Sequence, residues 1–185
     1  MNIVLIGYRG TGKTTVAQEL ASRLGCDWVD SDAEIERHAG KSIAAIFETV
    51  GESGFRELES QRLAELTQRE RLVLAVGGGA VLRESNRDRL KSFGHVVWLT
   101  ADPATILARI SGDATSESRR PNLTNVGGLT EIEQVLARRR AIYARCADLV
   151  VDTEGKMPAD VADEIIRRLD LSLLETDPSD PCDSH

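Results

Sequence analysis

Hydrophobic residues along the chain fall into two alternating patterns. Short apolar runs such as Ile3–Ile6 and Leu72–Val76 are typical of strands that are covered on both faces. Between such runs, apolar residues recur at helical spacing, as Phe55, Leu58 and Leu63 do. Strands that alternate with helices in this way predict an α/β fold, with a parallel sheet and helices on both of its faces.

The boundaries of these elements are indicated by residues that start or stop helices. Strands are expected over about 2–6, 27–30, 72–76, 95–99 and 148–151. Helices are expected over about 13–24, 31–38, 43–50, 54–69, 85–92, 103–110, 130–146 and 158–169. Gly25 and Gly40 are suitable helix stops, whereas Ser42 and Asp102 are suitable N-caps. One domain is therefore predicted over residues 1–170.

Two stretches lack any apolar period. Residues 112–128 are polar and contain glycine and arginine, and an irregular segment of this length inside a compact domain predicts a lid. Residues 171–185 are acidic toward their end and include two prolines, Pro178 and Pro181, which predicts a disordered tail.

Composition excludes several classes of protein. Hydrophobic residues make up 41% and charged residues 29% of the 185 residues, as in ordinary globular proteins, and the net charge of −7 argues against nucleic acid or an anionic membrane as a partner. The scattered cysteines, Cys26, Cys146 and Cys182, fit neither a disulfide framework nor a zinc site and suggest a reducing cytoplasm. Met1 leads directly into a strand, so no signal peptide is expected, and no apolar run reaches the ~20 residues of a membrane span.

The clearest chemical signal is the segment Gly7–Thr14, which reads G-x-x-x-x-G-K-T and directly follows the first apolar run. Its glycines allow successive backbone N–H groups to point toward phosphate oxygens, and the helix that follows adds the positive end of its dipole. Lys13 is placed to reach the β- and γ-phosphates, and the Thr14 hydroxyl to coordinate Mg²⁺. A glycine-rich turn is the alternative, but the preceding strand and following helix favour a nucleotide-binding loop.

Two further groups of unusual residues follow predicted strands, where ligands bind in open α/β sheets. The second strand ends in Asp30-Ser31-Asp32, whose carboxylates can face one cleft, although a simple N-cap gives the same residue types. The third strand ends in Gly77-Gly78-Gly79, which suits close approach of a ligand to bare backbone and otherwise forms a flexible turn.

Several arginines have positions that suggest anion binding. Arg56 is placed near a helix start, where a cation is unfavourable, so its partner is either a bound anion or a neighbouring carboxylate, Glu52 or Glu59. Arg119 and Arg120 lie in the expected lid. Arg138–Arg140 crowd one helix, and most such charge runs are solvated faces.

Taken in order, these motifs resemble those of the shikimate kinase family. The resemblance covers residues 1–170 and depends on the phosphate loop together with Asp30-Ser31-Asp32, Ser42–Phe47, Gly54–Glu59, Gly77–Val81, Arg120–Thr124, Arg140–Tyr143 and Val151–Thr153. It implies a P-loop kinase of three α/β/α layers, with the parallel strand order 2-3-1-4-5 of nucleoside-monophosphate kinases. The implied reaction is transfer of the γ-phosphoryl group of ATP to the 3-hydroxyl of shikimate, a step toward chorismate and the aromatic amino acids.

The resemblance also implies the role of each site residue. The catalytic residues are Lys13, Asp32 and Arg120. ATP would be bound by Gly10, Thr11, Gly12, Lys13, Thr14, Thr15, Arg109, Arg120 and Pro158. Shikimate would be bound by Asp32, Arg56, Gly77, Gly78, Gly79 and Arg140. Mg²⁺ would be held by Thr14 and Asp30. Asp32 is expected to orient the hydroxyl first and to act as a base second, because a loose phosphoryl-transfer transition state needs little base help. The family implies a cytoplasmic monomer.

Some assignments have alternatives. Arg119 competes with Arg120, which is favoured because it directly precedes Pro121, and Arg139 competes with Arg140, which is favoured by the Arg-Ala-x-Tyr spacing. Other functions remain as alternatives: a gluconate or nucleoside-monophosphate kinase, a GTPase-type switch, or a nucleotide-binding module without activity. The glycine turn with Phe55-Arg56 argues against the other kinases, and the lack of an N-K-x-D motif argues against the switch.

Overall fold

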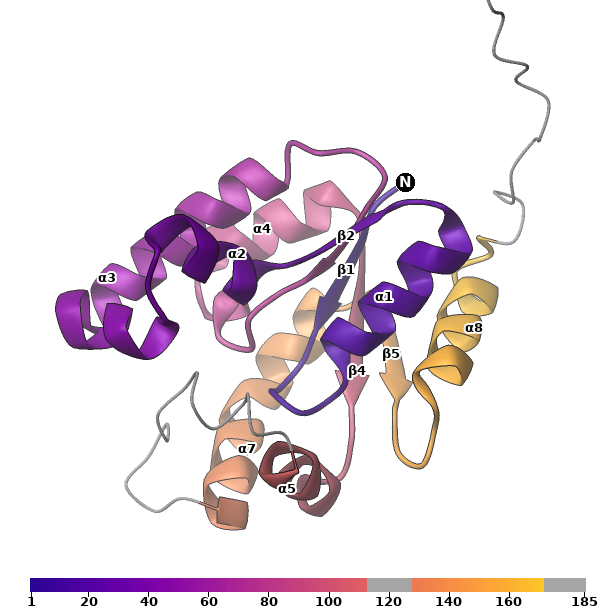
Figure 1. Cartoon of the computed structure of the whole chain (residues 1–185). Coiled ribbons are helices and arrows are strands. Elements are labelled where there is room, and N and C mark those ends of the chain that lie inside the picture. Colours follow the sequence, from indigo (N-terminus) through magenta and orange to yellow (C-terminus); the bar gives the residue numbers. More distant parts are fainter. Residues whose placement is uncertain (113–127, 172–185) are drawn as a thin grey trace, which may run out of the picture.

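The fold is built on one parallel sheet of five strands in the order β2-β3-β1-β4-β5. It is seen in a computed structural model of the chain, which describes residues 1–112 and 128–171 (Figure 1). The expected α/β class and strand order are thereby confirmed. The lid expected over 112–128 and the tail expected over 171–185 lie almost wholly outside the described residues. Within the described part of the chain, no helix is long and apolar enough to cross a membrane.

The elements follow the predicted alternation. The strands are β1 (Ile3–Ile6), β2 (Asp27–Asp30), β3 (Leu72–Ala75), β4 (His95–Thr100) and β5 (Leu149–Asp152). The helices are α1 (Lys13–Leu24), α2 (Ser31–Ala39), α3 (Ile43–Leu66), α4 (Glu84–Phe93), α5 (Pro103–Ser111), α7 (Gly128–Cys146) and α8 (Pro158–Arg168), with a 3₁₀ turn, η1, over Ala80–Leu82. Most boundaries agree with the predictions to within one or two residues, as expected where caps decide them.

Each face of the sheet carries its own apolar core, which gives the molecule three layers (Figure 1). On one face, Ile3, Leu5 and Val97 pack under α1 and α8. On the other face, alternate residues of the same strands pack under α3, α4 and α7. All four residues of β1 are fully buried, which explains why this strand reads as an unbroken apolar run. Burial of each such side chain stabilises the fold by about 1.5–3 kcal/mol.

Helix α3 contains the two helices that were predicted. It runs from Ile43 to Leu66 but is broken at Gly51, between the helix expected over 43–50 and the one expected from 54 onward. Gly51 has φ 68° and ψ −178°, a non-helical conformation that glycine adopts readily, so the chain changes direction there. The residues after the break carry Phe55 and Leu63 into the core, as predicted. Helices α2 and α3 pack together through Ile35, Ile43 and Phe55, and thereby position Arg56.

Candidate active site

The phosphate loop connects the end of β1 to α1, and its backbone is held in a conformation that only glycine adopts easily. Gly7, Gly10 and Gly12 have φ values of 142°, 78° and 86°. At Gly7 there is also no room, because a Cβ would lie 2.5 Å from the carbonyl oxygen of Leu99. The loop is closed from within by Thr11, whose buried hydroxyl donates to the carbonyl of Tyr8 at 2.8 Å. The shape of the loop is therefore fixed by its own residues.

Three side chains at the start of α1 are placed by this loop. The Lys13 ammonium lies across it and donates to the carbonyls of Gly7 and Tyr8, at 3.0 and 2.8 Å. Thr15 donates to the carbonyl of Gly12 at 2.9 Å. The Thr14 hydroxyl donates to Oδ2 of Asp30 at 2.7 Å, so the two residues predicted to hold Mg²⁺ meet across 16 positions of sequence. A hydroxyl and a carboxylate are oxygen ligands of the kind that Mg²⁺ prefers.

The Asp30-Ser31-Asp32 motif at the end of β2 contains the N-cap that was the simpler alternative for it. Asp30 is the N-cap of α2, and its Oδ1 accepts from the backbone N–H groups of Asp32 and Ala33. Its second oxygen is the one that faces Thr14, so the cap also fixes the carboxylate at the phosphate loop. Ser31 is buried and accepts the N–H of Gly77 at 3.0 Å, which ties this edge of the sheet to the glycine turn.

The glycine turn at 77–79 packs directly against the phosphate loop. A Cβ on Gly78 would lie 3.1 Å from the carbonyl oxygen of Gly7 and 3.6 Å from Cα of Tyr8. A Cβ on Gly79 would lie 2.4 Å from the Arg56 guanidinium, so this arginine lies flat against the backbone of the turn. Side chains larger than hydrogen would separate these groups, which explains the glycines at positions 78 and 79.

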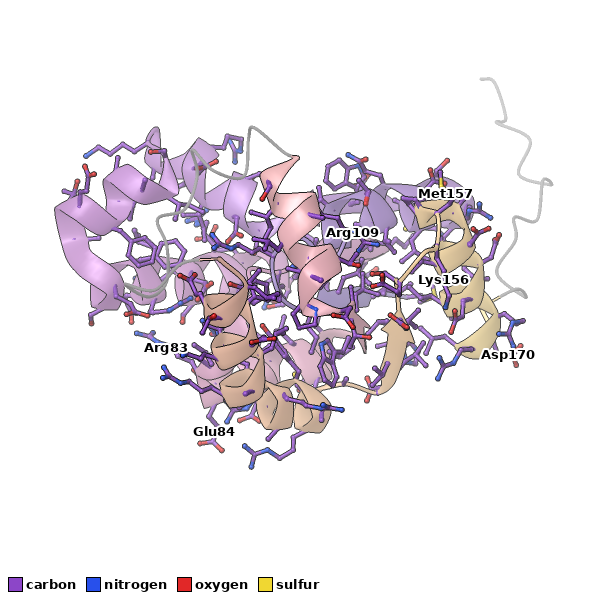
Figure 2. All side chains as sticks on the ribbon, turned by 90° about the horizontal axis from the view of Figure 1, so that it is seen from below. Arg83, Glu84, Arg109, Lys156, Met157 and Asp170 are labelled. Atoms are coloured by element: carbon purple, nitrogen blue, oxygen red, sulfur yellow. The ribbon has the colours of Figure 1, made fainter. Side chains whose placement is uncertain are left out.

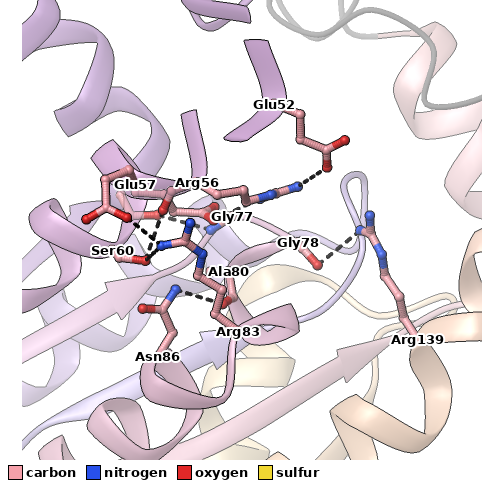
Figure 3. Close-up of polar contacts among 12 residues, drawn as sticks. Glu52, Arg56, Glu57, Ser60, Gly77, Gly78, Ala80, Arg83, Asn86 and Arg139 are labelled. Atoms are coloured by element: carbon pink, nitrogen blue, oxygen red, sulfur yellow. Dashed lines mark hydrogen bonds and ion pairs between the residues drawn. The ribbon is translucent and has the colours of Figure 1, made fainter. Parts of the chain in front are cut away.

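Arg56 is paired with the neighbouring carboxylates Glu52 and Glu59, as one of its two alternatives predicted, and it also lies against the glycine turn (Figure 3). Its Nη1 donates to Oε2 of Glu59 at 2.8 Å, and Nη2 lies 3.6 Å from Glu52. The Glu59 side chain is only 1% exposed and that of Arg56 is 13% exposed. The guanidinium also lies 5.3 Å from the ring centroid of Phe55. Its plane is thus held from several sides, as bidentate recognition of a carboxylate requires.

Arg139, rather than Arg140, reaches the glycine turn from α7. Its Nη1 donates to the carbonyl of Gly78 at 3.1 Å, on the opposite side of the turn from Arg56 (Figure 3). Tyr143, one helical turn further on, donates to the same carbonyl at 2.6 Å. Neighbouring residues on a helix project about 100° apart, so Arg140 points elsewhere. It is exposed and lines a cavity of ≈480 Å³ with Trp98, Leu136 and Val150. The structure therefore does not bring Arg140 to the predicted site.

The remaining residues predicted to bind the nucleotide are Arg109 and Pro158, which lie on α5 and at the start of α8 rather than at the glycine turn. Arg109 lies on α5 (Figure 2). It donates to the carbonyl and hydroxyl of Thr153, in the segment after β5, at 2.8 and 3.0 Å. It also donates to the carbonyl of Gly10 at 3.4 Å. Pro158 begins α8 at the end of the same segment and is partly exposed. Arg109 thus connects the phosphate loop to the segment that leads into Pro158.

Some predicted residues lie outside the part of the chain that the structure describes, and some residues of the site were not predicted as such. Arg119 and Arg120 lie outside the described residues. Glu59 was weighed only as a partner for Arg56, and Ser31 and Tyr143 were named only as parts of motifs. Glu59 and Tyr143 nonetheless hold Arg56 and the glycine turn in place. Each is a polar side chain that lies buried on the apolar face of its helix, and that position in the helical pattern was the signal for them.

The candidate site therefore brings together a preformed phosphate loop, a paired hydroxyl and carboxylate, and two arginines that converge on a glycine turn. Together with the strand order, this arrangement defines a P-loop kinase that acts on a small anionic molecule. The family model "Shikimate kinase" matches residues 9–170. The chain belongs to the shikimate kinase family, whose members phosphorylate shikimate with ATP.

Individual relatives agree with this assignment. The chain is 41% identical over 176 residues to the shikimate kinase of Rhodopirellula baltica, covering 95% of this chain and 94% of the relative. It is 43% identical over 176 residues to that of Syntrophus aciditrophicus, covering 90% of both. Among solved structures, the shikimate kinase of Acinetobacter baumannii in complex with shikimate superposes with a TM-score of 0.85 at 39% identity, covering 93% of this chain and 94% of that one.

More distant structures share the fold alone. A gluconokinase from Sinorhizobium meliloti superposes with a TM-score of 0.53 at 15% identity. Membership of the shikimate kinase family therefore does not favour the alternatives of a gluconate kinase, a nucleoside-monophosphate kinase or an inactive module.

Proposed function

We propose that this chain transfers the γ-phosphoryl group of ATP to the 3-hydroxyl of shikimate in the crevice between the phosphate loop and the glycine turn. The observation that carries the proposal is the convergence of Arg56 and Arg139 on Gly78 and Gly79, directly beside the phosphate loop. Shikimate is a small ring with one carboxylate and three hydroxyls. Two guanidinium groups suit its carboxylate, and the turn offers backbone N–H groups to its hydroxyls.

The roles of the donor residues follow from the chemistry of phosphoryl transfer. The transition state is loose and spreads negative charge over the phosphoryl oxygens, so catalysis depends on position and on nearby positive charge. The Lys13 ammonium lies within the phosphate loop and turns from the loop carbonyls to the β- and γ-phosphates when they bind. Backbone N–H groups of Gly10, Thr11 and Gly12 hold the phosphate chain, and Thr15 supports the loop. Arg109 and Pro158 accommodate the adenine.

Thr14 and Asp30 are the residues that would hold Mg²⁺. The hydroxyl and the carboxylate are already adjacent, and the N-cap bonds fix the orientation of the carboxylate. When bound, Mg²⁺ withdraws negative charge from the β- and γ-phosphate oxygens.

The acceptor is oriented by Asp32 and by the two arginines. Asp32 lies in the first turn of α2, two residues after Asp30, and accepts the hydrogen bond of the attacking hydroxyl. Its first role is to orient that hydroxyl, and its second is to take the proton as the P–O bond forms. Arg139 replaces Arg140 as the second carboxylate ligand, because only Arg139 contacts the turn. The role of Arg120 in neutralising the phosphates stays a prediction, as do the monomeric state and the cytoplasmic location.

A coupled ADP-release assay tests the function directly. Purified protein is given MgATP with shikimate, quinate, gluconate or no acceptor. Shikimate should give the highest kcat/KM by far, and the product should show a phosphorus resonance coupled to the proton on C3. Faster turnover of gluconate, or ADP release that is independent of any acceptor, would overturn the proposal.

A further inference from the structure

The side chains of two residues in the phosphate loop have no role in the chemistry described so far. Tyr8 and Arg9 occupy variable positions of the loop, and both point away from α1 toward α5 and α7. Nη2 of Arg9 donates to Oε1 of Glu131 at 3.3 Å, across 122 residues of sequence. The Glu131 side chain is only 1% exposed and that of Arg9 is 17% exposed. A carboxylate buried to this degree requires a cation, so the pair fixes the first turn of α7 to the phosphate loop.

Tyr8 reinforces the same connection with apolar contacts. Its ring is 1% exposed and packs with Ile106 of α5 and with Ile132 and Val135 of α7. The guanidinium of Arg9 lies 5.8 Å from the centroid of this ring. The ring therefore shields the Arg9–Glu131 pair on one side, which reduces solvent screening and strengthens the ion pair.

Helix α7 also carries the acceptor-binding residues. Arg139 lies eight residues after Glu131, about 12 Å along the helix axis, and donates to the carbonyl of Gly78. Tyr143 donates to the same carbonyl, and Gly78 packs against Gly7. The helix is thus tied to the phosphate loop at two levels: directly through Glu131, and through the glycine turn further along. Between these two ties, the position of Arg139 is determined.

We propose that Arg9 and Glu131 are positioning residues that hold α7, and with it Arg139, at a fixed distance from the phosphate loop. The pair thereby sets the affinity for the acceptor without touching the acceptor. Because Arg9 is neutralised by Glu131, it adds little to the positive charge that Lys13 presents to the nucleotide. This inference depends on the proposed function for its kinetic readout, since it assigns Arg139 to the carboxylate of shikimate.

A double-mutant cycle tests the pair. Glu131→Gln and Arg9→Met are made singly and together, with Glu133→Gln as the matched control, because Glu133 lies two residues further along α7 and is exposed. Each single variant should raise the KM for shikimate about tenfold, and the double variant should raise it no further, because coupled residues are not additive. The KM for ATP should stay within about twofold, and Glu133→Gln should match the wild type. Arg9→Lys should restore part of the loss.

Other results would overturn the inference. A fall in kcat with both KM values unchanged would show a merely structural role. A large effect of Arg9→Met with none for Glu131→Gln would show that Arg9 contacts a substrate itself. Additive effects in the double variant would show that the two residues act separately.

Amide hydrogen exchange separates this inference from the proposed function, because it needs no substrate. Glu131→Gln should speed exchange across α7 from its first turn to the turn of Arg139, and Glu133→Gln should not. If the wild-type protein fails to phosphorylate shikimate but this exchange pattern is found, the proposed function is wrong and the tie between the phosphate loop and α7 stands. Unchanged exchange in Glu131→Gln would contradict the inference that this ion pair holds α7 to the phosphate loop.

Discussion

The candidate site has two halves, one for the phosphoryl donor and one for the acceptor, and they are formed by different parts of the chain. The donor half is main chain: one stretch from Gly7 to Thr15 forms the loop, and its hydrogen bonds are made mostly within that stretch. The acceptor half is made of side chains from α2, α3 and α7, held by ion pairs and by bonds to the glycine turn. A loop of this kind is set by local backbone conformation, whereas the acceptor half depends on the correct packing of three helices. Changes in the donor half should therefore abolish turnover or folding, and changes in the acceptor half should mainly alter recognition.

The largest expected effect comes from removing the Lys13 ammonium of the donor half. Lys13→Ala should lower kcat by at least about 10³-fold, because preorganised positive charge on the phosphoryl oxygens supplies much of the catalysis. Steady-state kinetics with saturating shikimate measures this loss, and circular dichroism checks that the fold is intact. Lys41→Ala is the control, since that lysine is exposed in the connection before α3. A Lys13→Ala variant that kept a tenth of the wild-type kcat would contradict the expectation that changes in the donor half abolish turnover.

Backbone conformation in the donor half is tested by Gly7→Ala. The added Cβ meets the Leu99 carbonyl in a residue that also has φ 142°, so we expect a loss of about 2–4 kcal/mol in the free energy of unfolding. Gly25→Ala is the matched control, because Gly25 has φ 57° but nothing within 4 Å of its Cβ position; it should lose only about 1–2 kcal/mol. Urea denaturation compares the two, and equal losses would mean that the close contact at Gly7 is relieved by movement of the loop.

In the acceptor half, the choice between adjacent arginines is open to a direct comparison. Arg139→Met should lower kcat/KM for shikimate about 100-fold, because a hydrogen-bonded charge pair with the carboxylate is lost. Arg140→Met should stay within about twofold of the wild type, because that side chain lies on another face of α7. The reverse result would restore the assignment made from the Arg-Ala-x-Tyr spacing.

Arg56→Lys tests geometry without loss of charge. Lysine keeps the cation but not the planar fork, so the binding free energy of shikimate should weaken by about 1–3 kcal/mol, while kcat changes less. The KM for shikimate is the measurement, and Arg62→Lys, on the same helix and paired with Glu65, serves as the control. An unchanged KM in Arg56→Lys would refute a bidentate contact there.

The smallest effect is expected on the nucleotide side, in the segment that leads into α8. The Lys156 ammonium donates to Glu164 at 2.7 Å and lowers the pKa of that carboxyl, with a further contribution from Arg168. Since the folded pKa is lowered, the stabilisation is present above the unfolded pKa of about 4.3 and is lost as the pH falls through the folded value. Glu164→Gln should cost less than about 1 kcal/mol of unfolding free energy at pH 7 and nothing at a pH below the folded value. Urea titrations at the two pH values measure it, and a loss that persists in acid would exclude this ion pair as the cause.

The contrast between the halves also explains what could be predicted from sequence. In the donor half, glycines, lysine and threonine act through local backbone geometry, so the local sequence is enough to predict that they lie together. In the acceptor half, the sequence favoured Arg140, whereas Arg139 contacts the glycine turn. Arg139 and Arg140 differ by a rotation of about 100° about a helix whose packing the local sequence does not encode. The break at Gly51, by contrast, was predicted, because the glycine and serine residues over 51–54 favour the end of one helix and the start of the next.

The contact between Gly78 and the carbonyl of Gly7 has a consequence for how such enzymes diversify. Where two stretches of bare main chain touch, the gap between donor and acceptor cannot be widened or narrowed by rotating a side chain. Descendants of this protein are therefore free to exchange the groups that line the acceptor cavity and adopt new alcohols as substrates. The distance from the phosphate loop to the acceptor site would stay the same in such enzymes, while their acceptor specificity changes.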